Sequence, residues 1–252
     1  MLVLLPPSET KLVGGDGPAL DLDALSHTEL GPLREELTDE LVTLAADVRV
    51  SRTALGLSPR QDEEIARNAA LRTSPTMPAL RRYTGVLYDA LDVPSLRRAA
   101  AARATARLAI GSALFGLLRA ADPVPAYRLS AGSALPDRAS LASRWKPLLE
   151  PVLAAIADGE LVVDLRSGSY AALGRLPGAV TATVLAEHPD GRRTVISHVN
   201  KAHKGRLARL LATTRAEPMD AATVATIARR SGMRVQRPSP TVLEIVIPVH
   251  AP

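Results

Sequence analysis

The sequence predicts an α/β fold, with a mixed sheet and surrounding helices in a single compact domain over residues 1–252. Four or five segments with the pattern of strands are scattered among seven or so segments with helical periodicity, which is typical of this fold class. No internal repeat and no convincing boundary divides the chain. Apolar residues make up 46% of it and charged residues 23%, as in ordinary globular proteins. With one Trp, one Phe and four Tyr, the core must be filled mainly by Ala, Leu and Val.

The first third of the chain begins with a strand and continues through helices. Residues 1–5 are an apolar run that ends at two prolines, which predicts a buried strand. Leucines spaced three and four apart predict a helix over residues 30–46. A Ser-Pro pair, Ser58 and Pro59, is followed by acidic residues and predicts a helix start within residues 55–72. Residues 73–91 are broken by prolines and then helical in pattern.

The middle of the chain contains one ambiguous segment and one helix with internal prolines. Residues 95–120 begin as a helix, and the part from Leu108 onward fits a strand as well as a helix. Residues 141–157 predict a helix that is kinked or restarted at Pro147 and Pro151, because proline removes a backbone donor and crowds the preceding turn.

The last part of the chain alternates between strands and helices. Residues 160–173 predict a buried strand, a Ser/Gly turn and a short helix. Residues 179–187 and 194–199 alternate like the two strands of a hairpin. The remaining predicted elements are a helix beginning near Lys201, a helix within residues 220–232 and a strand over residues 241–249.

Charge is distributed unevenly along the sequence. Residues 1–90 have a net balance of −5, whereas residues 91–252 have a balance of +10. Residues 192–237 alone contain 11 Lys and Arg against two acids. Only 4 of the 31 cationic residues are Lys, so base composition of the genome explains the choice of Arg but not the clustering. Such a field favours an anionic partner: nucleic acid, a nucleotide or an acidic surface.

Several classes of function are excluded by composition. The chain has no Cys, which rules out disulfides, thiolate metal sites and thiol nucleophiles. The five histidines have no metal-ligand spacing, and neither a nucleotide fingerprint nor a nucleophile elbow is present. We therefore expect no metal and no cofactor. No segment has the length of a membrane span or a signal peptide, so we expect a cytoplasmic protein. The oligomeric state is left open.

The predicted helix from Lys201 separates its residues into two faces. On a helical wheel, Lys201, Lys204 and Arg209 lie opposite the leucines, with Gly205 and Ala208 between the cations. Glycine is unfavourable within a helix, and small residues flanked by cations would make a shallow seat for an anion. The alternative is a solvated amphipathic helix, whose charged face contacts only water.

Candidate ligand-binding residues also follow two predicted strands. Asp164 and Arg166 end one strand and are followed by Ser167 in a Gly/Ser turn. Ligands collect beyond the carboxyl ends of strands in open α/β sheets, and amides at a helix start suit phosphate. The alternative is that Asp164 and Arg166 form a structural pair. Ser8 and Lys11 follow the first strand in the same way.

A proline-fixed loop carries two further arginines. Arg119 and Arg128 flank Pro123 and Pro125, and two arginines held rigidly there could clamp a phosphate. Asp122 lies between them in sequence, so the alternative is that it satisfies one of them internally.

Several of these segments together resemble the YaaA family of peroxide stress proteins, also described as DUF328 or UPF0246. The resemblance runs through "LVLLPPSETK", "ARNAALRTSPTMPALRRYTGVLYDAL", "SALFGLLRAADPVPAYRL", "VVDLRSGSYAAL" and "SHVNKAHKGRLAR". It covers essentially the whole chain and is similar in detail to the actinobacterial-type branch. Phe115 and Ala120 replace Tyr and Pro of the proteobacterial type, and Asp164 puts an acid where that type has Asn. The last motif keeps its frame, which is Ser197, Lys201, a cation at 204, Gly205 and Arg209.

The resemblance implies a compact α/β fold, binding of double-stranded DNA through a positive cleft, a helix-hairpin-helix-like element and a role in limiting oxidative damage. The segment similar to the hairpin element is "LGLSPRQDEEIARN". It departs from the usual hairpin pattern because Gly56 precedes the turn and no second glycine follows.

From these observations we expect a cytoplasmic protein that binds duplex DNA without sequence preference and protects against oxidative damage. The expected partner is double-stranded DNA or a nucleotide-like anion. The paucity of aromatic residues favours contacts with the duplex backbone over stacking on single strands. The candidate DNA- or phosphate-binding residues are Ser8, Lys11, Arg119, Arg128, Arg166, Ser167, Lys201, Lys204 and Arg209.

The alternative is an enzyme acting on a nucleotide, a nucleoside or a damaged base. Its candidate catalytic residues are Asp164 and Lys201, since an acid beside a lysine of lowered pKa supports glycosidic cleavage through a Schiff base. On that hypothesis Ser8, Arg128, Asp164, Arg166 and Lys201 line one cleft.

Overall fold

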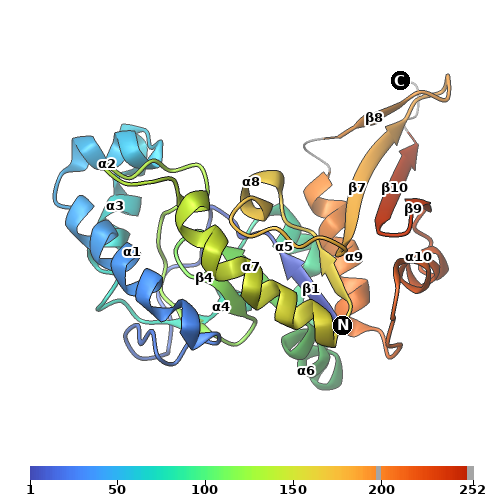
Figure 1. Ribbon diagram of the computed structural model, residues 1–252, viewed down its shortest axis with the longest axis horizontal. Coiled ribbons are helices and arrows are strands. Elements are labelled where there is room, and N and C mark those ends of the chain that lie inside the picture. Colours follow the sequence, from blue (N-terminus) through green and yellow to red (C-terminus); the bar gives the residue numbers. More distant parts are fainter. Residues whose placement is uncertain (197–199, 249–252) are drawn as a thin grey trace.

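The computed structural model describes residues 1–196 and 200–248, and its centre is a mixed eight-stranded sheet (Figure 1). The order along the sheet is β4-β3-β1-β6-β7-β10-β9, and β8 also pairs with β7. The strands from β3 to β10 in this order run parallel, whereas β4, β8 and β9 pair antiparallel. Their bounds are β1 Leu2–Leu5, β3 Leu108–Ser112, β4 Gly116–Arg119, β6 Val162–Asp164, β7 Val180–Glu187, β8 Arg193–Val195, β9 Val235–Ser239 and β10 Val242–Pro248.

Helices and long connections surround this sheet. Figure 1 shows α1, α2 and α3 grouped at one end of the molecule, and α10 beside β9 and β10 at the other. The α-helices are α1 Gly31–Leu44, α2 Val48–Leu55, α3 Asp62–Ala69, α4 Ala79–Arg82, α5 Val86–Leu91, α6 Arg98–Arg107, α7 Leu141–Gly159, α8 Gly168–Ala171, α9 Asn200–Thr213 and α10 Ala221–Arg230. Short 3-10 turns (η1 Thr28–Leu30, η2 Pro59–Gln61, η3 Val93–Ser95) and a small β2 Met77–Pro78 with β5 Pro123–Val124 complete the described elements. No helix among the described residues is both long and apolar enough to cross a membrane.

The predicted α/β class and mixed sheet are confirmed. The ambiguous segment from Leu108 forms two antiparallel strands, β3 and β4, and the predicted hairpin is present as β7 and β8. The end of the predicted second hairpin strand, residues 197–199, lies outside the described residues. The helix over residues 48–55 and the strand over residues 235–239 were not predicted. The helix has only eight residues, and the strand is mostly polar and exposed.

Of the two alternatives predicted for the prolines of α7, a kink or a restart, the restart is wrong, because a single helix runs from Leu141 to Gly159. Pro147 and Pro151 both lie on its exposed face. The carbonyls that lose a helical partner there face water, which satisfies them instead.

Buried arginines tie the long connections to the sheet. Arg34 is fully buried and donates to the carbonyls of Phe115, Leu117 and Ser26. Arg82, also fully buried, donates to the carbonyls of Leu12, Pro75 and Val124, which come from three separate segments. A guanidinium has five donors in a fixed plane, so one side chain can hold several segments at once.

Candidate functional site

Polar side chains gather at the carboxyl edge of the parallel strands. β1 lies between β3 and β6, with Leu5 paired to Ile110 and Leu4 paired to Asp164. Because all three strands run in the same direction, the loop after β1, the end of β3 and the loop after β6 meet at one edge. This is the position where open α/β sheets bind ligands. We call the polar residues at this edge the strand-end cluster: Ser8, Glu9, Lys11, Ser112, Arg128, Asp164 and Arg166.

Lys11 is the most perturbed member of the strand-end cluster. Its Nζ donates to the carbonyl of Ser8 at 2.9 Å and to that of Glu9 at 3.4 Å. The same amine stands over the ring of Tyr127, 4.2 Å from the centroid, and 5.4 Å from the ring of Tyr83. The pKa of Lys11 is lowered to about 7, mainly by burial, which Glu64 opposes and the neighbouring Arg128 reinforces. The amine of Lys11 therefore loses its proton far more readily than that of an ordinary lysine.

Beneath Lys11 lies a chain of hydroxyl groups. The hydroxyls of Tyr83 and Tyr127 are 2.7 Å apart, and Tyr127 is also 2.7 Å from Ser112 Oγ. Ser112 Oγ accepts the amides of Leu114 and Phe115. Burial raises the pKa of both tyrosines, so the hydroxyls stay protonated. No sequence motif indicated that Ser112 would join this group.

Arg128 forms the second charged centre of the strand-end cluster. It is buried, with 9% exposure, and its Nη2 donates to Glu9 Oε2 at 2.9 Å. The side chain of Glu9 is itself 64% exposed. Arg128 Nε is buried and has no hydrogen-bond partner among the described residues. A guanidinium with a buried, unused donor faces an exposed carboxylate of its own chain.

Asp164 and Arg166 form the structural pair that the sequence left as an alternative. Arg166 donates to Asp164 through its backbone amide at 3.0 Å, Nε at 3.0 Å and Nη2 at 2.8 Å. The remaining donors bind the carbonyls of Tyr170 and Gly174. The pair therefore shapes the turn after β6. Ser167 is exposed and precedes α8, which is a single turn of helix.

The predicted anion seat on α9 is wrong. Gly205 and Ala208 are buried against α5, so these small residues allow two helices to approach closely. A Cβ at Gly205 would overlap the carbonyl oxygen of Leu87 and lie 2.9 Å from the Cβ of Ala90. The helical wheel separated the two faces correctly, but it could not show that the face opposite the leucines also packs.

The three cations predicted to surround the anion seat on α9 have different roles. Lys204 Nζ donates to the carbonyl of Leu165 at 3.2 Å, and burial lowers its pKa while Asp164 opposes the shift. Arg209 donates to the carbonyls of Leu91 and Asp92 at the end of α5. Lys201 is exposed in the first turn of α9. Ser197, part of the same motif, lies outside the described residues.

The predicted clamp of Arg119 and Arg128 is also wrong. Arg119 pairs with Ala109 near the amino end of β3 and donates to the carbonyl of Ala106, whereas Arg128 lies at the opposite, carboxyl edge. Asp122 satisfies neither guanidinium. Its carboxylate accepts the amide of Arg119 at 2.9 Å and the hydroxyl of Ser26 at 2.7 Å.

Four of the five residues predicted to share a cleft therefore lie at one edge of the sheet: Ser8, Arg128, Asp164 and Arg166. No contact among the described residues joins Lys201 to them. The lysine whose charge interacts with Asp164 is Lys204. The catalytic pairing of Asp164 with Lys201 stays a prediction, and the full engagement of Asp164 by Arg166 does not favour it. Within residues 1–196 and 200–248, no three His, Asp or Glu side chains gather as they would around a metal ion.

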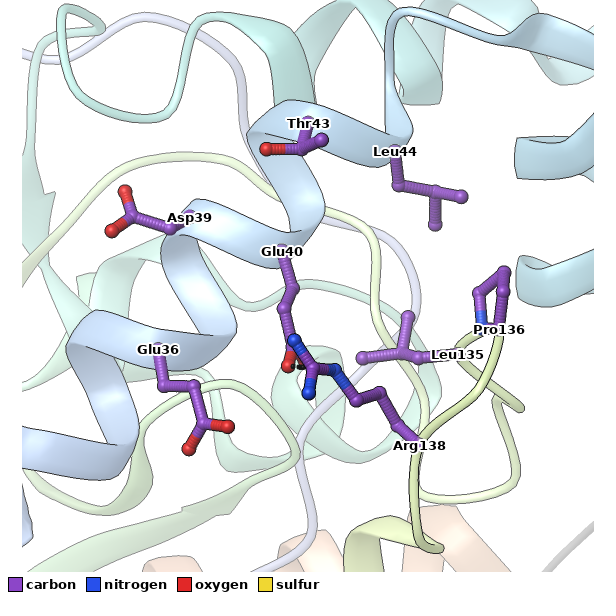
Figure 2. A pocket seen from close by; sticks show the side chains of 8 residues that line it. All are labelled: Glu36, Asp39, Glu40, Thr43, Leu44, Leu135, Pro136 and Arg138. Atoms are coloured by element: carbon purple, nitrogen blue, oxygen red, sulfur yellow. Dashed lines mark ion pairs between the residues drawn. The ribbon is translucent and has the colours of Figure 1, made fainter.

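A separate acidic pocket lies along α1 (Figure 2). Its volume is about 420 Å³, and Glu36, Asp39 and Glu40 line it from the helix. Figure 2 shows Arg138 reaching toward Glu40, to which it is ion-paired at 2.8 Å. All three carboxylates are ion-paired, Asp39 with Arg72, and Glu36 and Glu40 with Arg144. Arg138, the cation that lines the pocket, is itself held by Glu40, so the pocket offers a phosphate no unengaged guanidinium.

Comparison with known proteins identifies the family. The model of the family described as "Peroxide stress protein YaaA" matches residues 1–231. The chain belongs to this YaaA family. A UPF0246 protein of Corynebacterium efficiens is 48% identical over 94% of this chain and 95% of its own length. A UPF0246 protein of Streptomyces coelicolor is 43% identical over 95% and 94%, and one of Dinoroseobacter shibae is 30% identical over 81% and 83%. The higher identities agree with the actinobacterial-type branch.

The YaaA resemblance implied a helical hairpin, and two short helices stand at that place. α2 ends at Gly56, which has φ of +64°, and its amide caps the carbonyls of Arg52 and Thr53. α3 follows after η2. The acids at the start of α3 are paired: Asp62 accepts from Arg52 at 2.8 Å, and Glu64 accepts from Arg67. These ion pairs offset the negative charge that α3 would otherwise present to an anion.

Proposed function

We propose that this YaaA-family protein binds the phosphate backbone of duplex DNA through a basic surface of its carboxyl-terminal part. The late basic surface is defined as the exposed cations of residues 192–237. These residues are Arg192, Arg193, Lys201, Arg206, Arg215, Arg229, Arg230, Arg234 and Arg237. They lie in or next to β8, α9, α10 and β9, elements that Figure 1 shows together on one side of the molecule.

The observation that carries the proposal is that most Lys and Arg residues of this segment are exposed to solvent. Nine of the eleven cations in residues 192–237 are exposed, and the other two are Lys204 and Arg209. Arg193 and Arg234 share Glu187. Arg206, Arg215 and Arg230 have no carboxylate within 4.0 Å among the described residues. Exposed cations release counterions from DNA on binding, which supplies affinity without sequence preference.

Burial of the aromatic rings supports duplex over single-stranded DNA. Trp145, Phe115, Tyr83, Tyr88 and Tyr127 are all buried. Single-strand binders stack successive bases on exposed rings, and only Tyr170 retains partial exposure here. A surface of arginines without rings fits the regular backbone of a duplex.

The proposal links the family description to a physical effect. A protein that covers duplex DNA lowers the access of diffusing oxidants to the bases, which fits a peroxide stress protein. If the protein binds chromosomal DNA in this way, it acts in the cytoplasm.

The test compares two triple variants that remove the same formal charge. Arg229→Gln/Arg230→Gln/Arg237→Gln neutralises part of the late basic surface, whereas Arg81→Gln/Arg98→Gln/Arg175→Gln neutralises exposed arginines elsewhere. Binding to a fluorescent duplex is measured by anisotropy between about 50 and 200 mM salt. We expect the first variant to bind about tenfold more weakly at low salt, with a shallower salt dependence. Equal losses in both variants, or affinity that does not change with salt, would contradict the proposal.

A further inference from the structure

We propose that the strand-end cluster is a second binding site, in which Lys11 forms an imine with a small 2-oxo carboxylate whose carboxylate is held by Arg128. The inference is separate from DNA binding, because neither residue belongs to the late basic surface. It rests on two contacts to the same residue: Lys11 donates to the backbone carbonyl of Glu9, and Arg128 donates to the Glu9 carboxylate.

The amine of Lys11 is placed as a nucleophile and not as an ion-pair partner. Its hydrogen bonds go to the carbonyls of Ser8 and Glu9, and no carboxylate of the described residues lies within ion-pair distance. The aromatic faces of Tyr83 and Tyr127 surround it from below. Charges that act on it are Glu64 and Arg67 from α3, together with Glu9 and Arg128. Burial outweighs them and lowers the pKa to about 7, as in lysines that form Schiff bases.

Arg128 supplies the anion-binding half of the site. It is buried, its Nε lacks a partner, and its Nη2 binds the carboxylate of Glu9 at 2.9 Å. Burying an unused guanidinium donor is costly, and a bidentate carboxylate would satisfy it. The Glu9 side chain is mostly exposed, so it can move into water when another carboxylate takes its place. Glu9 therefore acts as an internal stand-in for the ligand.

The loop that covers the amine is open to solvent. Ser8 Oγ lies 3.1 Å from Thr10 Oγ1, and Thr84 Oγ1 donates to Thr10 Oγ1, also at 3.1 Å. Both of these hydrogen bonds are exposed to solvent. Gly85, with φ of +96°, lets the chain pass close to them, since a Cβ there would lie 3.2 Å from Thr10 Oγ1. These hydroxyls provide donors for the oxygen of a carbonyl group that approaches Lys11.

The chemistry balances without a further reagent. The neutral amine attacks the carbonyl carbon, the carbonyl oxygen takes up a proton, and the nitrogen loses one to give a carbinolamine. Loss of the hydroxyl group with the second nitrogen proton releases water and leaves the imine. The net change is amine plus carbonyl to imine plus water.

The test is reductive trapping with internal reference lysines. The protein is incubated at pH 7 with glyoxylate and cyanoborohydride, digested, and its adducts are quantified by mass spectrometry. The chain has only four lysines, of which Lys146 and Lys201 are exposed. We expect the Lys11 adduct to form at least about tenfold faster than theirs, because only a small fraction of an ordinary lysine is neutral at pH 7. Equal rates at the three lysines would overturn the proposal.

Two comparisons test the carboxylate subsite. Glycolaldehyde carries no carboxylate, so we expect it to label Lys11 several-fold more slowly than glyoxylate does, and Arg128→Gln to remove that preference. Lys11→Arg keeps a cation at the loop but cannot form an imine, and it should lose the adduct while binding duplex DNA as before. The role of Arg128 would be overturned if glycolaldehyde labelled Lys11 faster than glyoxylate. It would also be overturned if Arg128→Gln left the preference for glyoxylate unchanged. The outcome with DNA is measured separately, so either proposal can fail alone.

Discussion

At the scale of single residues, Lys11 makes stability depend on pH. Its pKa is about 7 in the folded protein and 10.5 ordinarily. Between these values the unfolded chain binds a proton that the folded protein lacks, so the free energy of unfolding rises with pH by up to about 1.4 kcal/mol per pH unit. Below pH 7 both states are protonated and the full penalty of burying the charge is present. Above about pH 10.5 the penalty is absent.

This dependence is measured by urea unfolding at pH 7, 8 and 9, comparing the unsubstituted protein with Lys11→Met. We expect the unsubstituted protein to gain stability relative to the variant as pH rises. Stability curves that stay parallel over this range would show that Lys11 keeps an ordinary pKa.

A substitution at Gly205 tests whether this residue packs against α5 or forms part of an anion-binding surface. Because a Cβ would overlap the Leu87 carbonyl, we expect Gly205→Ala to destabilise the protein by about 1–3 kcal/mol. Thermal unfolding is the measurement. Gly31→Ala is the matched control, since nothing lies within 4 Å of a Cβ at that helical position. If Gly205→Ala instead unfolds like the control, α5 and α9 are not in close contact there.

At the scale of elements, the turn between β6 and α8 depends on one buried ion pair. Asp164 and Arg166 are 9% and 7% exposed, and removing one partner of such a pair leaves an uncompensated charge. We expect Asp164→Asn to cost about 2–4 kcal/mol of the free energy of unfolding. The double variant Asp164→Asn/Arg166→Met should recover part of that loss, which chemical denaturation would measure. A double variant less stable than the single one would mean that Arg166 acts mainly through Tyr170 and Gly174.

Sequence reasoning was most successful where burial imposes a period. β1, α1 and α9 follow their apolar patterns, and the residues after β1 and β6 were expected at the edge where they lie. Predictions from the sequence were wrong where a polar side chain binds groups of its own chain and not a ligand. Arg119 and Arg209 bind carbonyls of their own chain, and Gly205 packs against a helix distant in sequence. Such contacts depend on the tertiary arrangement, which the local pattern around an arginine or a glycine does not encode.

At the scale of the whole molecule, the sheet connects the first strand to the last. β1 begins at Leu2 and β10 ends at Pro248, with β6 and β7 between them in the sheet. We expect this continuity to produce one cooperative unfolding transition, as predicted for a single domain over residues 1–252. Calorimetry would give equal calorimetric and van't Hoff enthalpies for such a transition. Two separate transitions would indicate that β7–β10 with α10 unfolds as its own unit.

The central position of β1 has a consequence for synthesis on the ribosome. Its first neighbour, β3, starts at Leu108, and its second, β6, starts at Val162. At about 5–20 residues per second, the apolar strand waits many seconds for both partners to be translated. Pairings between such distant segments also form slowly. The apolar residues Leu2–Leu5 therefore have neither sheet partner until residues 108–112 have been translated.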